Sequence, residues 1–329
     1  MVFCLMACWV CGQAAAGDVT RVCISLAGDC VLGGEEETRG DERSFDSVMA
    51  KKGLSWPFSG LGQLFCADDI TLVNLECVLK DGAGDMASGR LYNFRGEAAY
   101  ADILRLGGVE AVNIANNHFI DYGEKGREST KRALQAAEIG YAGYAELWVK
   151  EVRGKKIGFG GIRETVYRQD RTVMAGDIQK LKEMGCDAIV YSCHFGEEYS
   201  RTHSSLQTKM AREAIDLGAN LVVGHHPHVV QGVEAYHGGM ILYSLGNFIF
   251  GGNLDLTEFD GCAAQAEFVW KGEQLAGTRL LLIPVLTTGS APENDFRPVI
   301  AEGTDKARIF GKMQADSEMI VQESMYVPK

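Results

Sequence analysis

Short runs of β-branched and apolar residues alternate along this chain with longer stretches of helical periodicity. The strand-like runs lie at residues 22–28, 70–76, 109–115, 156–162, 188–193, 219–224 and 240–246. The clearest helical stretches between them are 97–107, 124–139, 174–185 and 204–217. Strands that alternate with helices are joined by crossover connections and run parallel, so the pattern predicts a layered α/β fold.

The C-terminal part of the chain has a different pattern. Residues 263–275 and 278–286 indicate an antiparallel pair with a Lys-Gly-Glu turn, and a short helical pattern follows at 303–315. Because neither an internal repeat nor a low-complexity linker divides the chain, we expect residues 17–329 to form one domain.

The N-terminus resembles a secretory signal peptide. An apolar run from Val2 to Val10 is followed by Ala14-Ala15-Ala16 before Gly17, although no Lys or Arg precedes the run. The run is shorter than the roughly 20 apolar residues that a membrane-spanning helix needs. We therefore expect residues 1–16 to be a signal peptide and the protein to be exported, as a periplasmic, cell-surface or membrane-associated protein. A lipoprotein cleavage site at Leu5-Met6-Ala7-Cys8 is the alternative.

Charge and cysteine usage narrow the class of protein further. The formal net charge of −12 argues against a nucleic-acid partner, because phosphate contacts need a Lys/Arg surface.

Ten cysteines occur, an odd number of them beyond residue 16, and none has CxxC spacing. Buried free thiols are the first interpretation, and disulfides in an exported protein stay open as the second.

Polar residues follow the strand-like runs at their carboxyl ends. They are Asp29, Glu76, Asn116, Asn117, His118, His194, His225, His226, His228 and Asn247. In open α/β sheets, functional groups gather beyond the carboxyl ends of the strands. A buried cluster of imidazoles without a counter-charge would be costly, and Asp29 and Glu76 provide that counter-charge. A divalent cation would bind all of these groups together, so the pattern predicts a metal site.

Six motifs occur in a fixed order within residues 20–300. They are Gly28-Asp29, Asn74-Leu75-Glu76, Ala115-Asn116-Asn117-His118, His194-Phe195-Gly196-Glu197-Glu198-Tyr199, Gly224-His225-His226-Pro227-His228 and Tyr243-Ser244-Leu245-Gly246-Asn247-Phe248. This set resembles the motifs of the CapA (PGA_cap, poly-γ-glutamate capsule synthesis) family, a branch of the calcineurin-like metallophosphoesterases.

The resemblance implies a fold and a set of residue roles. The implied fold is a four-layer α/β/β/α sandwich of the metallophosphoesterase type, with a site for one or two divalent ions (Mn, Fe or Zn). The implied metal ligands are Asp29, Glu76, Asn117, His194, His226 and His228. His118 resembles the general acid that meets the leaving group.

The residues around these positions are further candidates for orienting ligands or contacting substrate. They are Asn116, Asp121, Glu198, His225 and Asn247. Asp121 and Glu198 are interpreted as groups that orient histidines. The alternatives are that Asp121 caps a helix and that Glu198 is a solvated loop carboxylate.

Two departures from the wider superfamily set the expected metal content. Val31 stands where a histidine ligand is expected, and Glu76 replaces a bridging aspartate. One position then has four protein ligands and the other only three, so we expect one metal to be retained and the second to exchange. A histidine at position 31 is expected to raise occupancy of the weaker position.

The expected function follows from this resemblance. The chain is expected to be a capsule or cell-envelope polymer biosynthesis protein whose metal site hydrolyses phosphoester or amide bonds. The alternative is a non-catalytic capsule-assembly component that binds an anionic polymer or a partner protein. In either case the expected partners are an anionic envelope polymer or its precursor and other capsule-synthesis proteins.

Overall fold

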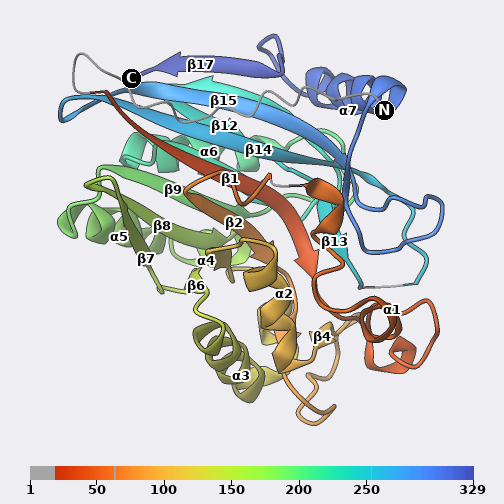
Figure 1. Ribbon diagram of the computed structural model, residues 1–329. Helices are drawn as coiled ribbons and strands as arrows, with labels where there is room; N and C mark the ends of the chain where they lie inside the picture. The colour runs from red at the N-terminus through yellow and green to blue at the C-terminus, as the bar shows by residue number, and fades with distance from the viewer. Residues whose placement is uncertain (1–18, 63, 253) are drawn as a thin grey trace.

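The structure is a computed structural model that describes residues 19–62, 64–252 and 254–329 (Figure 1). Its larger sheet has the order β16-β15-β14-β1-β2-β5-β6, with β13 beside β1 and β17 beside β15. The strands are β1 (Val19–Val31), β2 (Ile70–Leu75), β5 (Ala111–Asn113), β6 (Gly140–Ala142), β13 (Asn247–Phe250), β14 (Asp260–Lys271), β15 (Gln274–Leu286), β16 (Val299–Ile300) and β17 (Ser324–Pro328).

The second sheet has the order β11-β12-β10-β9-β8-β7, and a small sheet pairs β3 with β4. The strands are β7 (Trp148–Val152), β8 (Lys155–Arg163), β9 (Ala188–His194), β10 (Leu221–His225), β11 (Val233–Tyr236), β12 (Gly239–Leu242), β3 (Val78–Leu79) and β4 (Arg95–Gly96). The helices are α1 (Phe45–Lys52), α2 (Ala101–Leu106), α3 (Gly123–Ala136), α4 (Glu164–Gln169), α5 (Thr172–Glu183), α6 (Ser205–Leu217) and α7 (Gly303–Ala315). Short 3-10 helices are η1 (Glu36–Thr38), η2 (Ser59–Leu61), η3 (Ala98–Tyr100) and η4 (His118–Ile120).

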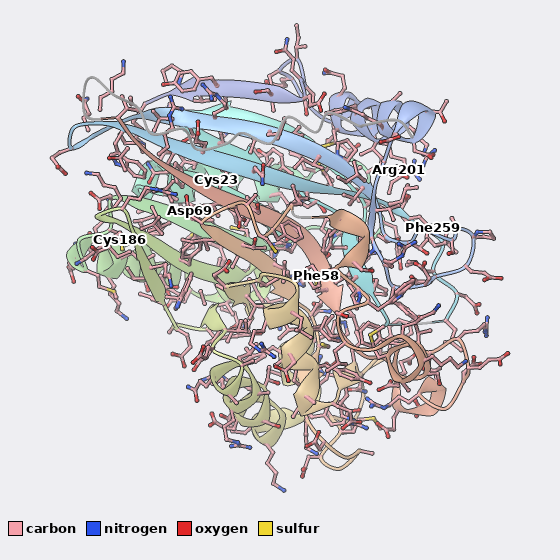
Figure 2. The ribbon with its side chains drawn as sticks, viewed as in Figure 1. Cys23, Phe58, Asp69, Cys186, Arg201 and Phe259 are labelled. Atoms are coloured by element: carbon pink, nitrogen blue, oxygen red, sulfur yellow. The ribbon has the colours of Figure 1, made fainter. Side chains whose placement is uncertain are left out.

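Three apolar clusters separate four layers, which confirms the predicted α/β/β/α sandwich. The middle cluster joins the two sheets, with Ile24 and Phe268 from one and Val190 and Leu221 from the other. An outer cluster that includes Phe58 packs α1, α2 and α3 against the larger sheet (Figure 2). A second outer cluster packs α5 and α6 against the smaller sheet. Burial of apolar surface between these layers is the main favourable contribution to folding.

The predicted elements agree with the structure where their pattern is long. The C-terminal pair forms as β14 and β15, and α7 spans Gly303–Ala315, as expected from the sequence. The helical stretch at 204–217 becomes α6, which begins with a capping box between Ser204 and Gln207. The run at 240–246 is wrong as one strand, because β12 ends at Leu242 and β13 begins at Asn247.

Parallel strand pairs position the functional residues. β1 lies between β2, in parallel, and β14, in antiparallel orientation, so the larger sheet is mixed. Before β2, the Asp69 carboxylate accepts a hydrogen bond from the backbone N–H of Cys23 at 2.9 Å, which fixes the start of this pairing (Figure 2). The carboxyl ends of β1, β2, β9 and β10 therefore meet at one edge of the sandwich.

Two expectations concern the thiols and the chain's relation to a membrane. Cys30, Cys77, Cys193 and Cys262 are buried free thiols, as the first interpretation of the cysteines predicts. Within the described ranges, no helix is both long and apolar enough to cross a membrane. The expected signal peptide at residues 1–16 lies outside the described residues.

Candidate metal centre

Asp29 is placed by an irregularity in β1. The pairing of β1 with β2 shifts between Leu26 and Asp29, and its pairing with β13 shifts after Asp29. At this point Gly28 passes so close to Gly246 that an added Cβ would lie 1.9 Å from its carbonyl oxygen. The backbone N–H of Asp29 donates to the same oxygen at 3.0 Å. Glycine at position 28 thus permits the close approach that directs the Asp29 carboxylate into the site.

Asn74 joins the two carboxylates. Its Nδ2 donates to Asp29 Oδ1 at 2.8 Å and to Glu76 Oε2 at 3.1 Å. Its Oδ1 accepts from Nδ2 of Asn113 at 2.9 Å and of Asn116 at 3.2 Å. Both carboxyl groups are fully buried, and this amide network holds them in position next to each other.

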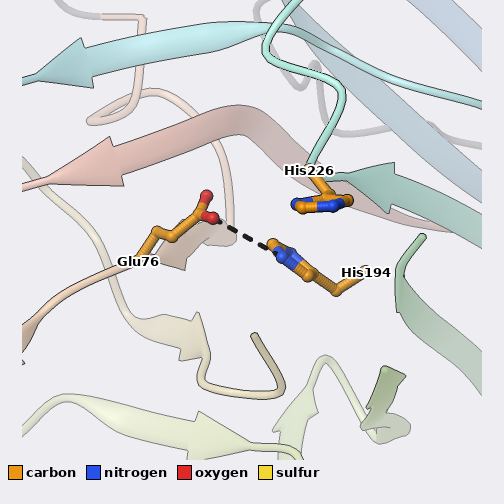
Figure 3. Close-up of side chains that lie close together, drawn as sticks. All are labelled: Glu76, His194 and His226. Carbon is orange, nitrogen blue, oxygen red and sulfur yellow. Dashed lines mark ion pairs between the residues drawn. The ribbon is translucent and has the colours of Figure 1, made fainter. Parts of the chain in front are cut away.

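The histidines approach the carboxylates from the smaller sheet. His194 ends β9, with Nε2 2.5 Å from Asn117 Oδ1 and 3.5 Å from Glu76 Oε1. The His226 ring lies 4.6 Å from the His194 ring, and Figure 3 shows both facing Glu76. Three segments far apart in the sequence therefore converge on Glu76.

His228 reaches the same carboxylates from the loop after β10. Its Nδ1 lies 3.2 Å from Asp29 Oδ2 and 2.9 Å from Asn247 Oδ1, and its Nε2 lies 3.9 Å from Glu76 Oε1. His226 and His228 have φ values of 100° and 58°. Non-glycine residues in this region cost free energy and persist where the surrounding structure fixes them, which is common at functional sites.

Among the residues that the structure describes, three groups of side chains that could hold a metal have donor atoms within 4.8 Å of one another. One comprises Glu76, His194 and His226, and a second comprises Asp29, Glu76 and His228. The third comprises Glu198, His226 and His228. Apart from Asn117, the first two groups bring together the residues expected from the sequence to hold two metals, and Glu76 belongs to both.

Burial and mutual charge set the protonation of this cluster. Burial, with the charge of Asp29 added, raises the pKa of Glu76 well above its usual value. Burial alone would also raise the pKa of Asp29, but hydrogen bonds with His225 and His228 outweigh it and lower that pKa. Burial lowers the pKa of His194, and burial together with the charge of His228 lowers that of His226 to about 4.

His228 behaves in the opposite way. Burial opposes its positive charge, but Glu76 and Asp29 raise its pKa to about 9. Two of the imidazoles are thus held neutral, the form that can bind a metal, while the positive charge of the third balances the Asp29 carboxylate. Metal binding at the second position requires loss of that proton, since only a deprotonated nitrogen can be a ligand.

His118 and Asp121 form a separate pair at the start of η4. His118 Nδ1 lies 2.6 Å from Asp121 Oδ2, and that oxygen also accepts from the Phe94 backbone N–H at 2.7 Å. Arg90 donates to Asp121 Oδ1 at 2.8 Å. The cap interpretation of Asp121 is wrong, because the N-cap position of α3 is Tyr122. Asp121 instead fixes the His118 ring, which leaves Nε2 as the atom available for proton exchange.

The other candidate residues surround this arrangement. The Asn116 Oδ1 accepts from the His118 and Phe119 backbone N–H groups, so Asn116 shapes the loop. His225 is buried with Nδ1 3.3 Å from Asp29 Oδ1. Glu198 is exposed. Burial lowers the pKa of His228, and the charge of Glu198 adds to the larger effects of Glu76 and Asp29, which raise it.

Comparison with known proteins places this site in a family. The model of the family "Bacterial capsule synthesis protein PGA_cap" matches residues 23–252. The chain belongs to this family. The matched region contains every residue expected to hold a metal.

Two curated relatives of the PGA_cap family extend the match. The capsule biosynthesis protein CapA of Bacillus anthracis is 26% identical over 322 residues, covering 90% of this chain and 74% of the relative. The PGA biosynthesis protein CapA of Bacillus subtilis is 29% identical over 249 residues, covering 69% of this chain and 62% of the relative. The chain thus spans between 62% and 74% of the length of these relatives.

One solved structure supports the fold. A Staphylococcus aureus protein described as a candidate 5'-nucleotidase, solved with alpha-ketoglutarate, aligns with a TM-score of 0.51 at 12% identity, covering 84% of this chain and 57% of that chain. This likeness agrees with a metallophosphoesterase-type α/β sandwich and concerns the fold alone.

The PGA_cap site fits a divalent cation on its own geometry. Glu76 Oε1 and the Nδ1 atoms of His194 and His226 are buried without a hydrogen-bond partner. Unpartnered buried polar atoms are costly, and a cation bound to the carboxylate oxygen would satisfy it. Carboxylate, amide and imidazole donors together suit Mn, Fe or Zn.

Three residues support the PGA_cap site without a role that the sequence predicts: Asn74, Asn113 and Arg90. Of these, only Asn74 lies in a motif. All three act through other side chains rather than as ligands, and a buried amide inside a strand has no distinctive sequence signal. Asn113 and Asn74 are in register on β5 and β2, which is information that only the strand pairing provides.

Proposed function

We propose that this chain is a capsule or cell-envelope polymer biosynthesis protein with a metal-centred hydrolytic site that acts on phosphoester or amide bonds. One observation carries the proposal: two donor groups share Glu76, whose fully buried Oε1 has no hydrogen-bond partner. A structural role alone gives no reason to bury two carboxylates and neutral imidazoles at the same edge.

The residues divide into two positions and a proton donor. Glu76, Asn117, His194 and His226 would hold one cation, and Asp29, His228 and the shared Glu76 would hold a second. The bound metal would polarise the scissile group and lower the pKa of a coordinated water. His118, oriented by Asp121, protonates the leaving amine or alkoxide through Nε2.

A non-catalytic role is the second candidate, and Val31 favours it. Val31 is fully buried in the apolar cluster beneath the larger sheet. Its side chain has no donor atom, so the second position lacks the nitrogen that a histidine there would provide. In that case the same site binds an anionic polymer or a partner protein without hydrolysing it.

The location and the partners of the protein are proposed from its similarity to two relatives. The relatives are described as capsule and PGA biosynthesis proteins. We infer that this chain is exported and works in the periplasm, at the cell surface or at the membrane. Its proposed partners are an anionic envelope polymer or its precursor and other capsule-synthesis proteins. The net charge of −12 disfavours nucleic acid.

Metal analysis combined with activity assays tests the function. Purified protein is dialysed against a weak chelator, its metal content is measured, and hydrolysis of p-nitrophenyl phosphate and of poly-γ-glutamate is followed. We expect at least one retained metal and metal-dependent hydrolysis of one substrate class. Retained metal without hydrolysis would favour the binding role, and no metal under metal-replete conditions would contradict the metal-centred proposal.

A further inference from the structure

Arg163 lies at the same sheet edge as the metal-ligand residues, although no motif includes it. It is the last residue of β8, and in the parallel pairing of β8 with β9 it is in register with His194. Register partners on neighbouring strands direct their side chains to the same face of a sheet. Arg163 therefore faces the side on which His194 meets Glu76.

The guanidinium of Arg163 lacks a carboxylate partner among the residues that the structure describes. Its one hydrogen bond there is from Nη1 to the Tyr144 hydroxyl, at 3.4 Å. Arg90, the other arginine beside the site, differs because it forms an ion pair with Asp121. An arginine has five N–H donors, so most of those on Arg163 are available to a ligand.

Tyr144 is held in position by a strained turn. Gly143 and Glu146 exchange backbone hydrogen bonds at 2.9 and 3.1 Å, and the two residues between them, Tyr144 and Ala145, have φ values of 54° and 66°. A turn with two positive φ values normally uses glycine or asparagine. Strain of this kind persists where the surroundings fix the residue, and it is common beside functional sites.

The contacts of Tyr144 show what fixes it. Its hydroxyl donates to the Asn116 carbonyl oxygen at 2.7 Å, and its ring stacks on Phe119 at 5.7 Å. Asn116 and Phe119 flank Asn117 and His118 in the chain. The turn therefore connects Arg163 to the loop that carries the first cation position and the proton donor.

We propose that Arg163, positioned by Tyr144, binds the anionic oxygens of the substrate beside the metal-ligand residues. The ligand is an oxyanion, either phosphoryl or carboxylate, because a guanidinium fork matches both in bidentate geometry. The inference rests on the proposed function in that it names the substrate-binding group of the same site.

Anion binding to the full protein tests this role. Inorganic phosphate and glutarate are titrated calorimetrically into Mn-loaded and metal-free wild type, Arg163→Gln, Arg163→Lys and Arg132→Gln. Arg132 is the matched control, an exposed arginine of α3. We expect Arg163→Gln to raise the Kd of at least one probe by about 10- to 100-fold, the range for loss of hydrogen bonds to a charged group. Arg163→Lys should recover part of the loss, and Arg132→Gln should bind as wild type does.

The two probes and the metal content separate the outcomes. A loss confined to phosphate identifies a phosphoryl group, and a loss confined to glutarate identifies a carboxylate. An unchanged Kd for both probes in Arg163→Gln, with wild-type metal content, would overturn the role of Arg163 and leave the metal proposal intact. If wild type holds no metal, the proposed function fails, and the metal-free titrations still decide whether Arg163 binds anions. Absence of anion binding by the wild type, both Mn-loaded and metal-free, would also overturn the role of Arg163.

Tyr144→Phe tests the positioning step. This variant keeps the ring that stacks on Phe119 and removes the hydroxyl. We expect it to weaken anion binding in wild type but to have little further effect in Arg163→Gln, because both changes act on one interaction. Additive effects in this double-mutant cycle would show that Tyr144 does not act through Arg163.

Discussion

Glu76→Gln should have opposite effects on stability in the presence and absence of metal. Glu76 is fully buried, its Oε2 accepts from Asn74 at 3.1 Å, and its Oε1 has no hydrogen-bond partner. Glutamine has nearly the same shape and can still accept from Asn74. The substitution therefore removes the oxygen shared by both cation positions, with little change in packing.

The magnitudes follow from ligand linkage and chain length. A metal present at 100 times its Kd stabilises the folded state by about 2.7 kcal/mol. For a chain of 329 residues, the unfolding entropy near 60 °C is roughly 0.7 kcal/mol per kelvin, so metal should raise the wild-type Tm by about 4 °C. Removing an unsatisfied buried carboxylate should stabilise the metal-free protein by about 1 to 3 kcal/mol, or roughly 1 to 4 °C.

Differential scanning calorimetry with and without Mn²⁺, after treatment with chelator, measures both effects. Asp177→Asn is the control, because Asp177 is a buried carboxylate of α5 that accepts a hydrogen bond from Tyr191 at 3.0 Å, outside the ligand groups. It should keep the full metal-dependent increase in Tm. The reasoning is refuted if Glu76→Gln keeps that increase, or if it destabilises the metal-free protein by more than about 1 kcal/mol.

Three further substitutions test other parts of the molecule. Burial raises the pKa of Asp68 to about 6, so the folded state favours its protonated form and stability falls as pH rises from about 4 to 6. In urea denaturation, Asp68→Asn should match wild type at pH 4 and exceed its free energy of unfolding by about 3 kcal/mol at pH 7. Equal stability at pH 7 would contradict this. Asp121→Asn should lower kcat by about 10- to 100-fold, because it disturbs the orientation of the His118 ring. The metal content should not change, and a loss of metal would instead show that Asp121 supports metal binding. Val31→His should lower the free energy of unfolding by roughly 2 to 4 kcal/mol in thermal denaturation, because the imidazole enters an apolar cluster. A stable variant with more bound metal would instead support the expectation from the sequence.

Long periodic segments were predictable from the sequence, while short ones were not. The capped α6 and the β14–β15 pair have clear patterns, and both form as expected. By contrast, β6 has three residues and β16 two, and segments of that length have no measurable periodicity. Their existence depends on neighbouring strands, which local sequence does not encode.

The candidate site was predictable to the extent that its residues stand at the ends of strands. Histidines and carboxylates in such positions are conspicuous, and the structure brings Asp29, Glu76, His194, His226 and His228 together. Their roles as metal ligands stay predictions. The residues that hold them, such as Asn74, could not be recognised, because a buried amide is informative only once its hydrogen-bond partners are known.

The expected inequality of the two metal positions shows the limit of counting ligands along a chain. The count treats Val31 as a missing ligand, and its burial in apolar surroundings agrees with that. The structure adds a carboxylate from another segment, since Glu198 lies within 4.8 Å of donor atoms on His226 and His228. Because Glu198 is exposed, it would exchange with water more readily than a buried histidine would. Glu198 would therefore offer the second position a replacement donor, but one that would keep this position more labile than the one built on His194.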